Sequence, residues 1–302
     1  MKQVTSLQKG VLFMVIASFC FALTGAAARK LGDHLSAVEL VLFRNLIGVV
    51  FVLVTLTRRP LVQVGGKMGL LIFRGIIGTL ALFLFFFAIT RIGLAEAITY
   101  QQSYPIFLAL FSFYWLGERL LPRQWWAIVI GFAGICCIFI PQMSLDWKSG
   151  QQHLLGLMNA WMTALAYMSI RQLSGYYDNR AIILSFMLSG IVLPAFSLGL
   201  GPIPGWEAVF PSFTLPLFQD LPWILLLGGA ALVGQVYLTK AFAHGKAGLI
   251  SVAGYSNILF SVLFGWLLGD SIPGAMTWLG ITLIVWSGVS VARKEGESEQ
   301  DV

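Results

Sequence analysis

The densest polar run inside any long apolar segment of this chain is Thr99-Tyr100-Gln101-Gln102-Ser103-Tyr104-Pro105. Pro105 has no amide hydrogen, so in a helix the carbonyl of Gln101 loses its usual hydrogen-bond donor. Gln101 and Pro105 are four residues apart and share one helix face, with Tyr104 beside them. This face offers donors, acceptors and an aromatic ring to a small polar molecule. The alternative is a structural proline kink whose freed groups bond to neighbouring helices.

A second polar run, in the other half of the chain, contains Ser251, Gly254, Tyr255, Ser256 and Asn257. If the two halves are related by a pseudo-two-fold axis, the two runs face each other across one cavity. We therefore predict that Tyr255 and Asn257 contact a bound molecule together with the residues of the first run. The alternative is that the serine and glycine residues allow helices to pack closely.

Arg44 lies about seven residues into an apolar segment, roughly 10 Å along a helix axis. A lipid-exposed arginine at this depth is unfavourable, so its side chain should face protein or a water-filled cavity. It either binds an anionic or zwitterionic group such as a carboxylate, or it pairs with Glu39, with carbonyl groups or with a lipid phosphate. Lys240 and Arg74 are closer to segment ends, and we favour extension of their side chains to the membrane surface.

Four further side chains extend the predicted binding set. Gln235 and Tyr237 lie deeper in their segment than Lys240 and are better placed to reach a cavity. Trp161 and Tyr167 add an aromatic and polar face, although both residue types also serve as ordinary packing groups.

Two acidic residues close their segments, Glu118 in Leu116-Gly117-Glu118-Arg119-Leu120 and Asp270 in Leu268-Gly269-Asp270-Ser271-Ile272. A glutamate at a helix C-terminus is unfavourable to the helix dipole, so Glu118 should meet Arg119, Arg123 or free amides of another helix. We predict gate or packing roles for both residues.

The composition determines which elements carry these residues. With 58% hydrophobic residues, 11% charged residues and a mean hydropathy of +0.85, the chain has more apolar surface than a soluble fold of 302 residues can bury. Spanning segments must satisfy their own backbone groups, and continuous apolar runs indicate helices rather than a β-barrel. We predict an all-α integral membrane protein with ten spans, at residues 9–28, 37–57, 69–90, 94–116, 124–141, 154–171, 181–200, 221–242, 247–268 and 274–292.

The loops between these segments give an orientation. Lys and Arg accumulate in short cytoplasmic loops, and with the N-terminus inside, twelve basic residues face the cytoplasm against four outside. Both termini are therefore predicted to be cytoplasmic. The polar stretch 141–153 is predicted to be the loop between the halves, residues 199–221 an outer loop, and residues 295–302 a disordered tail.

The halves also match each other in sequence. A shift of 152 residues superposes six identical residues, including Ile106 on Ile258, Gly117 on Gly269 and Trp126 on Trp278. We predict a duplication, with repeats at 1–145 and 146–294. Because each unit has five spans, the two copies are inverted relative to each other.

These residues resemble the drug/metabolite transporter superfamily, specifically its EamA-type members. The resemblance covers residues 9–292 and depends on the features Pro105, Leu116 to Leu120, Trp125, Gly134, Gly234-Gln235, Ala241-Phe242, Tyr255, Gly265, Gly269-Asp270, Trp278 and Gly288. The second half departs from the pattern at Asn257, opposite Pro105, and at Asp270, where a glutamate is usual. The resemblance implies two inverted five-helix EamA-like repeats and transport of small organic metabolites.

Our prediction is a secondary or facilitative transporter in the inner (plasma) membrane, working by alternating access around a midplane cavity. The substrate would be amino-acid-like, a nucleoside, S-adenosylmethionine or a vitamin, with protons or a counter-substrate as coupling partners. A lipid or polyprenyl-phosphate flippase is the alternative. The sequence has no phosphate-binding loop motif and no HExxH motif, so we expect no enzyme activity, cofactor, metal or nucleic-acid partner. A monomer and a homodimer are both compatible with the sequence.

Overall fold

A computed structural model of the protein describes residues 6–58, 61, 64–116, 122–145, 147–173, 175–243 and 253–297. These residues are almost entirely helical and contain no strand, so the predicted fold class is confirmed. The helices are α1 (Ser6–Leu31), α2 (Ala37–Arg58), α3 (Met68–Ile92), α4 (Leu94–Gln101), α5 (Tyr104–Leu116), α6 (Pro122–Leu145), α7 (Trp147–Leu173), α8 (Asn179–Leu200), the short 3-10 helix η1 (Phe218–Asp220), α9 (Leu221–Ala243), α11 (Ser256–Leu267) and α12 (Ala275–Glu297).

Each of the ten predicted spans coincides with helix over the part of the chain that the structure describes. By length and composition, five apolar stretches among the described residues can cross a membrane: Gln8–Leu31, Ala37–Arg58, Met68–Ile92, Asn179–Leu200 and Phe218–Leu238. Shorter apolar helices add Trp125–Ile138, Ser256–Leu267 and Ala275–Ser287.

The fourth predicted span is not one helix but two. It ends as α4 at Gln101 and restarts as α5 at Tyr104, with Pro105 as the second residue of the new helix. Proline suits the first turn of a helix because the amide it lacks would have no partner there. The amide of Gln102 donates to the carbonyl of Ile98 at 2.8 Å, and the amide of Ser103 donates to the carbonyl of Tyr100 at 3.0 Å. The helix is therefore interrupted next to Pro105, where the sequence predicted a disturbed hydrogen-bond pattern.

The prediction of a loop at residues 141–153 is wrong. Helix α6 continues to Leu145 and α7 begins at Trp147, so polar residues here extend the helices instead of separating them. Residues 201–217 are irregular, as predicted for most of the 199–221 loop. Helix α12 reaches Glu297, and the rest of the predicted tail lies outside the described residues.

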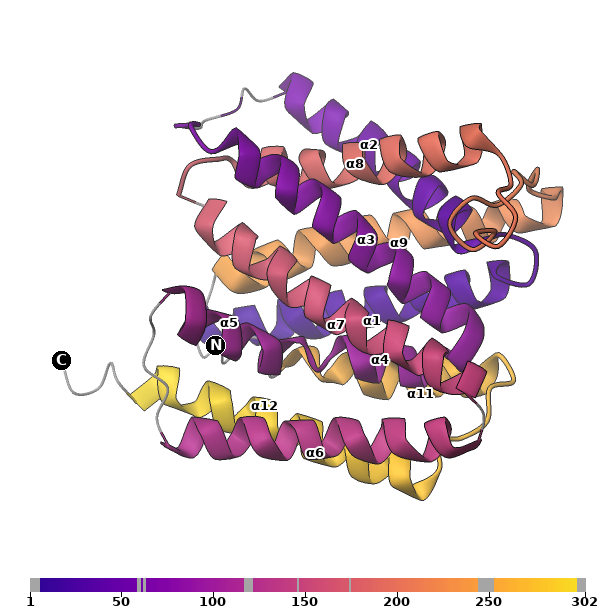
Figure 1. The fold of residues 1–302 in the computed structure, drawn as a ribbon. Helices are drawn as coiled ribbons and strands as arrows, with labels where there is room; N and C mark the ends of the chain where they lie inside the picture. Colours follow the sequence, from indigo (N-terminus) through magenta and orange to yellow (C-terminus); the bar gives the residue numbers. More distant parts are fainter. Residues whose placement is uncertain are drawn as a thin grey trace, which may run out of the picture.

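The helices run roughly along one common direction and stack in layers (Figure 1). Helices α2 and α8 form one edge of the bundle and α6 and α12 the other, with α1, α3, α4, α7, α9 and α11 between them. Extensive contacts join α1 to α9, α3 to α7, and α6 to α12. The beginning of α1 and the end of α12 lie at the same end of the bundle, on the left in Figure 1.

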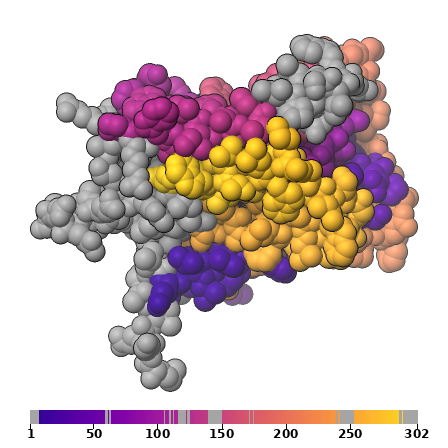
Figure 2. Space-filling model, turned by 90° about the horizontal axis from the view of Figure 1, so that it is seen from below, coloured from indigo at the N-terminus to yellow at the C-terminus, as the bar shows by residue number. Residues whose placement is uncertain are grey.

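Helices α6 and α12 lie side by side across one face of the molecule (Figure 2). Trp126 on α6 is 68% exposed and Trp286 on α12 is 51% exposed. Large exposed apolar side chains on a membrane protein are suited to contact with lipid. The opposite sides of these helices pack closely, because Gly134 and Gly280 face each other.

We expect a Gly134→Ala variant to be destabilised. A Cβ at this position would lie 2.9 Å from both the Gly280 carbonyl oxygen and Leu283 Cβ, so the two helices would have to separate. Such overpacking costs about 1–3 kcal/mol. The matched control is Gly229→Ala in α9, where nothing lies within 4 Å of the added carbon. Thermal unfolding in detergent should show a lower Tm for Gly134→Ala and an unchanged or higher one for the control; equal melting temperatures would contradict the prediction.

Candidate functional site

A cavity lies in the middle of the bundle, where α1, α2, α3, α7, α8 and α9 surround the breaks before α5 and α11. The centres of water molecules have about 120 Å³ of space in it, and one water needs about 10–15 Å³ by this measure, so the cavity has room for several waters or for part of a small metabolite. The residues predicted from the sequence that line the cavity are Arg44, Gln101, Tyr104, Tyr167, Gln235 and Asn257.

The break between α4 and α5 meets a second break at this cavity, the turn at Tyr255 that separates helical residues 253–254 from α11. The side-chain nitrogen Nε2 of Gln102 donates a hydrogen bond of 2.6 Å to the carbonyl oxygen of Gly254. The hydroxyl of Ser18 on α1 reaches the same oxygen at 3.4 Å. Gln102 and Gly254 are 152 residues apart, which is the repeat shift found in the sequence. The bond therefore joins two positions that correspond under the predicted duplication.

Two arginines enter the cavity from different helices. Arg44 on α2 is 7% exposed and Arg74 on α3 is 5% exposed. Their guanidinium carbons lie 5.4 Å and 4.8 Å from the centroid of one ring, that of Phe186 on α8. The position of Arg74 differs from its predicted extension to the membrane surface, because its side chain points inward from the first two turns of α3.

Polar contacts to these arginines are few. Arg44 Nη1 donates to Asn45 Oδ1 at 3.3 Å, whereas Nε and Nη1 of Arg74 have no hydrogen-bond partner in the described part of the chain. Glu39, considered above as a partner of Arg44, instead accepts bonds from Ser36 and from the amide of Thr214 at 2.6 Å. No ion pair between described residues involves either arginine.

The aromatic residues of the predicted set divide between the cavity and its surroundings. The rings of Tyr104 and Tyr167 pack edge to face with centroids 4.9 Å apart. Tyr255 is buried next to the lining, and its hydroxyl has no partner among the described residues. Trp161 is 42% exposed and packs on Phe111, and Tyr237 packs on Phe13, so neither side chain lines the cavity.

Asp270 connects three elements at the end of the bundle where α1 ends. Its Oδ1 accepts a hydrogen bond from Arg29 Nε at 3.0 Å and forms an ion pair with Arg29 Nη2 at 2.9 Å, and its Oδ2 accepts the amide hydrogen of Leu94, the first residue of α4. Lys240 is exposed, with its ammonium 5.3 Å from the ring centroid of Tyr237. Glu118, the other predicted gate residue, lies outside the described residues.

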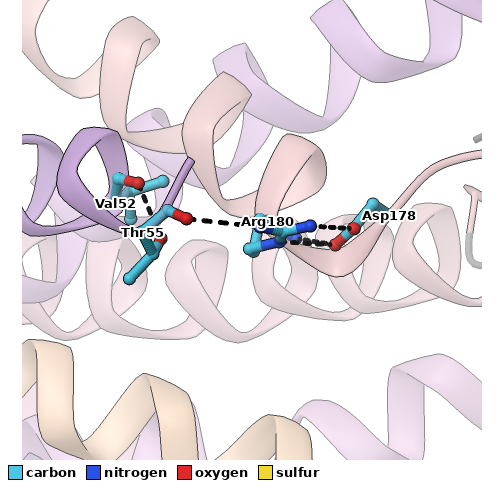
Figure 3. A network of polar contacts seen from close by, with 4 residues as sticks. All are labelled: Val52, Thr55, Asp178 and Arg180. Carbon is cyan, nitrogen blue, oxygen red and sulfur yellow. Dashed lines mark hydrogen bonds and ion pairs between the residues drawn. The ribbon is translucent and has the colours of Figure 1, made fainter. Parts of the chain in front are cut away.

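The opposite end of the bundle is held by a second polar network (Figure 3). Asp178 caps the first turn of α8 by accepting the amide hydrogen of Arg180 at 2.9 Å, and it pairs with the Arg180 guanidinium at 2.7 Å. Arg180 also donates to the carbonyl of Thr55 near the end of α2, at 3.5 Å. The acidic cap and the cation near the α2 C-terminus suit both helix dipoles.

One buried polar pair was not predicted from the sequence. The hydroxyl of Tyr100 lies 3.0 Å from Nδ1 of His153, and both residues are at most 4% exposed. The sequence placed His153 in a loop, but it lies on the second turn of α7. No sequence signal predicted this contact, because His153 precedes the predicted span at 154–171 and was assigned to the loop before it. Among the described residues no group of His, Cys, Asp and Glu could hold a metal ion.

Comparisons with known proteins agree with this architecture. The model of the EamA-like transporter family matches residues 8–140. An uncharacterized transporter of Helicobacter pylori is 31% identical over 94% of both chains, and the pseudopaline exporter CntI of Pseudomonas aeruginosa is 31% identical over 95% of this chain and 97% of its own. The riboflavin transporter of Vibrio cholerae is 26% identical over 95% of this chain and 94% of its own.

One solved crystal structure is similar in fold, with a TM-score of 0.59 at 19% sequence identity. The similarity covers 96% of this chain and 97% of that one, so it extends over the whole bundle.

Proposed function

The chain belongs to the EamA-like transporter family, and we propose that it is a secondary or facilitative carrier of a small polar or amphipathic organic metabolite, not an enzyme. The substrate binds in the central cavity, and the two halves of the bundle move so that the cavity opens first to one side of the membrane and then to the other.

The observation that carries this proposal is the meeting of two interrupted helices at the cavity. Irregular backbone at membrane depth is tolerated where it lines a cavity or is buried in protein. Here the break after α4 and the start of α11 bring Gln101, Gln102, Gly254 and Asn257 to one site. Amide donors, acceptors and tyrosine rings at a single place suit a substrate with both polar and apolar parts.

The contact pattern supports the proposed inverted repeats at 1–145 and 146–294. If the two halves exchange places, the first span (α1) takes the position of the sixth (α7), and the third span (α3) takes the position of the eighth (α9). It therefore converts the α1–α9 contact into the α7–α3 contact, and both are extensive. The same exchange maps the α6–α12 pair and the α2–α8 pair onto themselves, and both of these pairs are in contact.

We place the protein in the inner (plasma) membrane with both termini in the cytoplasm. The distribution of basic residues supports this orientation, and the beginning of α1 and the end of α12 at one end of the bundle are compatible with it (Figure 1). The Arg29–Asp270 contact then lies on the outer side and the Asp178–Arg180 network on the inner side.

Transport by purified protein in liposomes tests the proposal. The panel contains labelled amino acids, nucleosides, S-adenosylmethionine and vitamins, with and without a pH gradient. We expect saturable uptake of at least one compound, reduced about tenfold or more by Gln101→Ala and by Asn257→Ala. The control is Thr282→Ala, because Thr282 is exposed on α12 and its hydroxyl donates to the carbonyl of Trp278 in the same helix. Flipping of a fluorescent lipid without any saturable uptake would favour the flippase.

A further inference from the structure

The cavity contains two cations and no anion among its described lining residues. Arg44 and Arg74 line it, and no described lining residue is an aspartate or glutamate. The nearest acid along α2, Glu39, is used by Ser36 and Thr214. A buried guanidinium without a counter-charge is strongly unfavourable, and two of them near each other also repel.

The surrounding protein offsets this cost only in part. Phe186 presents one ring to both guanidiniums, but a cation–π contact is weak compared with the desolvation of a charge. Asn45 accepts one long bond from Arg44, and two nitrogens of Arg74 have no partner among the described residues. The cavity therefore contains hydrogen-bond donors for which the described part of the chain supplies no acceptor.

The geometry also brings the two charges within reach of one molecule. The guanidinium carbons of Arg44 and Arg74 lie 5.4 Å and 4.8 Å from the centroid of the Phe186 ring. The distance between the two carbons is therefore at most about 10 Å. Gly78 makes room for this arrangement, since a Cβ there would lie 2.0 Å from Arg74 Nη1. Guanidinium groups bind carboxylate and phosphate oxygens with two parallel hydrogen bonds.

We propose that the substrate of the central cavity is an organic dianion, whose carboxylate or phosphate oxygens bind Arg44 and Arg74 and whose carbon skeleton packs against Phe186, Tyr104 and Tyr167. This inference rests on the proposed transport function and specifies the substrate class for the same site. The two positive charges require two negative ones, and the aromatic lining favours an organic anion over an inorganic ion.

Binding in detergent, measured by isothermal titration calorimetry, tests the proposal independently of transport. The probes share one ring and differ in charge: phthalate is a dianion, benzoate a monoanion and phthalamide neutral, while phenyl phosphate separates phosphate from carboxylate recognition. We expect phthalate or phenyl phosphate to bind at least tenfold more tightly than benzoate, and phthalamide more weakly still. Equal affinities across the charge series, or no binding of either dianion, would overturn the proposal.

Variants assign the binding to the two arginines. Arg44→Gln and Arg74→Gln should each weaken dianion binding at least tenfold, and Gly78→Ala, which keeps both charges but displaces Arg74, should weaken it severalfold. The control is Arg91→Gln, because Arg91 is on the same helix and near Phe87 but is exposed; its affinity should stay within twofold of the parent.

Stability of the ligand-free protein separates a binding role from a structural one. If Arg74 awaits a ligand, removing its unpaired charge should leave Tm unchanged or raise it, whereas a structural arginine would lower it. A lower Tm together with unchanged dianion affinity in Arg74→Gln would overturn the proposal. If a neutral metabolite is transported and the arginine variants transport it normally, the proposed function stands and the dianion inference fails.

Discussion

In an Asp270→Asn variant, the cavity should become accessible from the end of the bundle where α1 ends and α4 begins, about 100 times more often than in the parent. Asp270 accepts one hydrogen bond from Arg29 and one from the amide of Leu94, and its carboxylate pairs with the Arg29 guanidinium. Its side chain is only 14% exposed, and that of Arg29 is 32% exposed. Charge-assisted hydrogen bonds at such a site contribute about 2–3 kcal/mol after allowance for the exposure of Arg29, which corresponds to roughly 30- to 150-fold in a two-state equilibrium.

Labelling of a cysteine in the cavity measures this change. The reporter is Gln101→Cys in a background without Cys20, Cys136 and Cys137, treated with a membrane-impermeant maleimide from the outer side. Asp33→Asn is the matched control, because Asp33 pairs with Lys30 at the same end but both side chains are about half exposed, and such surface pairs contribute little. A labelling rate in Asp270→Asn equal to that of the control would show that the contact does not close this side.

The spans and the helix break could be predicted from local sequence because both depend on local physics. An apolar segment of about 20 residues must be helical in a bilayer, whatever surrounds it. Pro105 removes an amide hydrogen wherever it occurs, and the break between Gln101 and Tyr104 lies next to it. The end of α6 was predicted wrongly because it lies outside the hydrocarbon layer. There the backbone can bond to water, so polar residues are compatible with a helix as well as with a loop.

The lining of the cavity could be predicted only in part. Local polarity identified Gln101, Tyr104 and Asn257, but the inward direction of Arg74 depends on the rotation of α3 about its axis. That helix is apolar on all sides, so its sequence has no amphipathic pattern from which to derive an orientation. Tyr237, on α9, does not line the cavity, and its direction could not be derived from the sequence for the same reason.

Long-range partners were the least predictable. The role of Asp270 as a gate or packing residue was predicted from its position at the end of an apolar segment, but Arg29 is 241 residues away in the sequence. Nothing local selects that arginine over other basic residues on the same side. The contact follows from the position of α1 between α9 and α11, which only the assembled bundle defines.

In a Gln102→Leu variant, transport should fall about 5- to 150-fold while the protein remains folded. Among the described side chains, the Gly254 carbonyl would keep the Ser18 hydroxyl at 3.4 Å as its donor, and a buried acceptor that loses its main donor costs about 1–3 kcal/mol. The cost falls where the two interrupted helices meet, so it should disturb the register between the halves rather than the helices themselves.

Two controls distinguish this hydrogen bond from general damage to the bundle. Gln151→Leu makes the same substitution at an exposed position on α7 and should transport normally. Gly254→Ala keeps the carbonyl, and its added carbon would lie no closer than 3.7 Å to other atoms, so it should retain transport within about threefold. If Gly254→Ala abolished transport and Gln102→Leu did not, close backbone packing, and not the Gln102–Gly254 bond, would be what joins the two halves at the cavity.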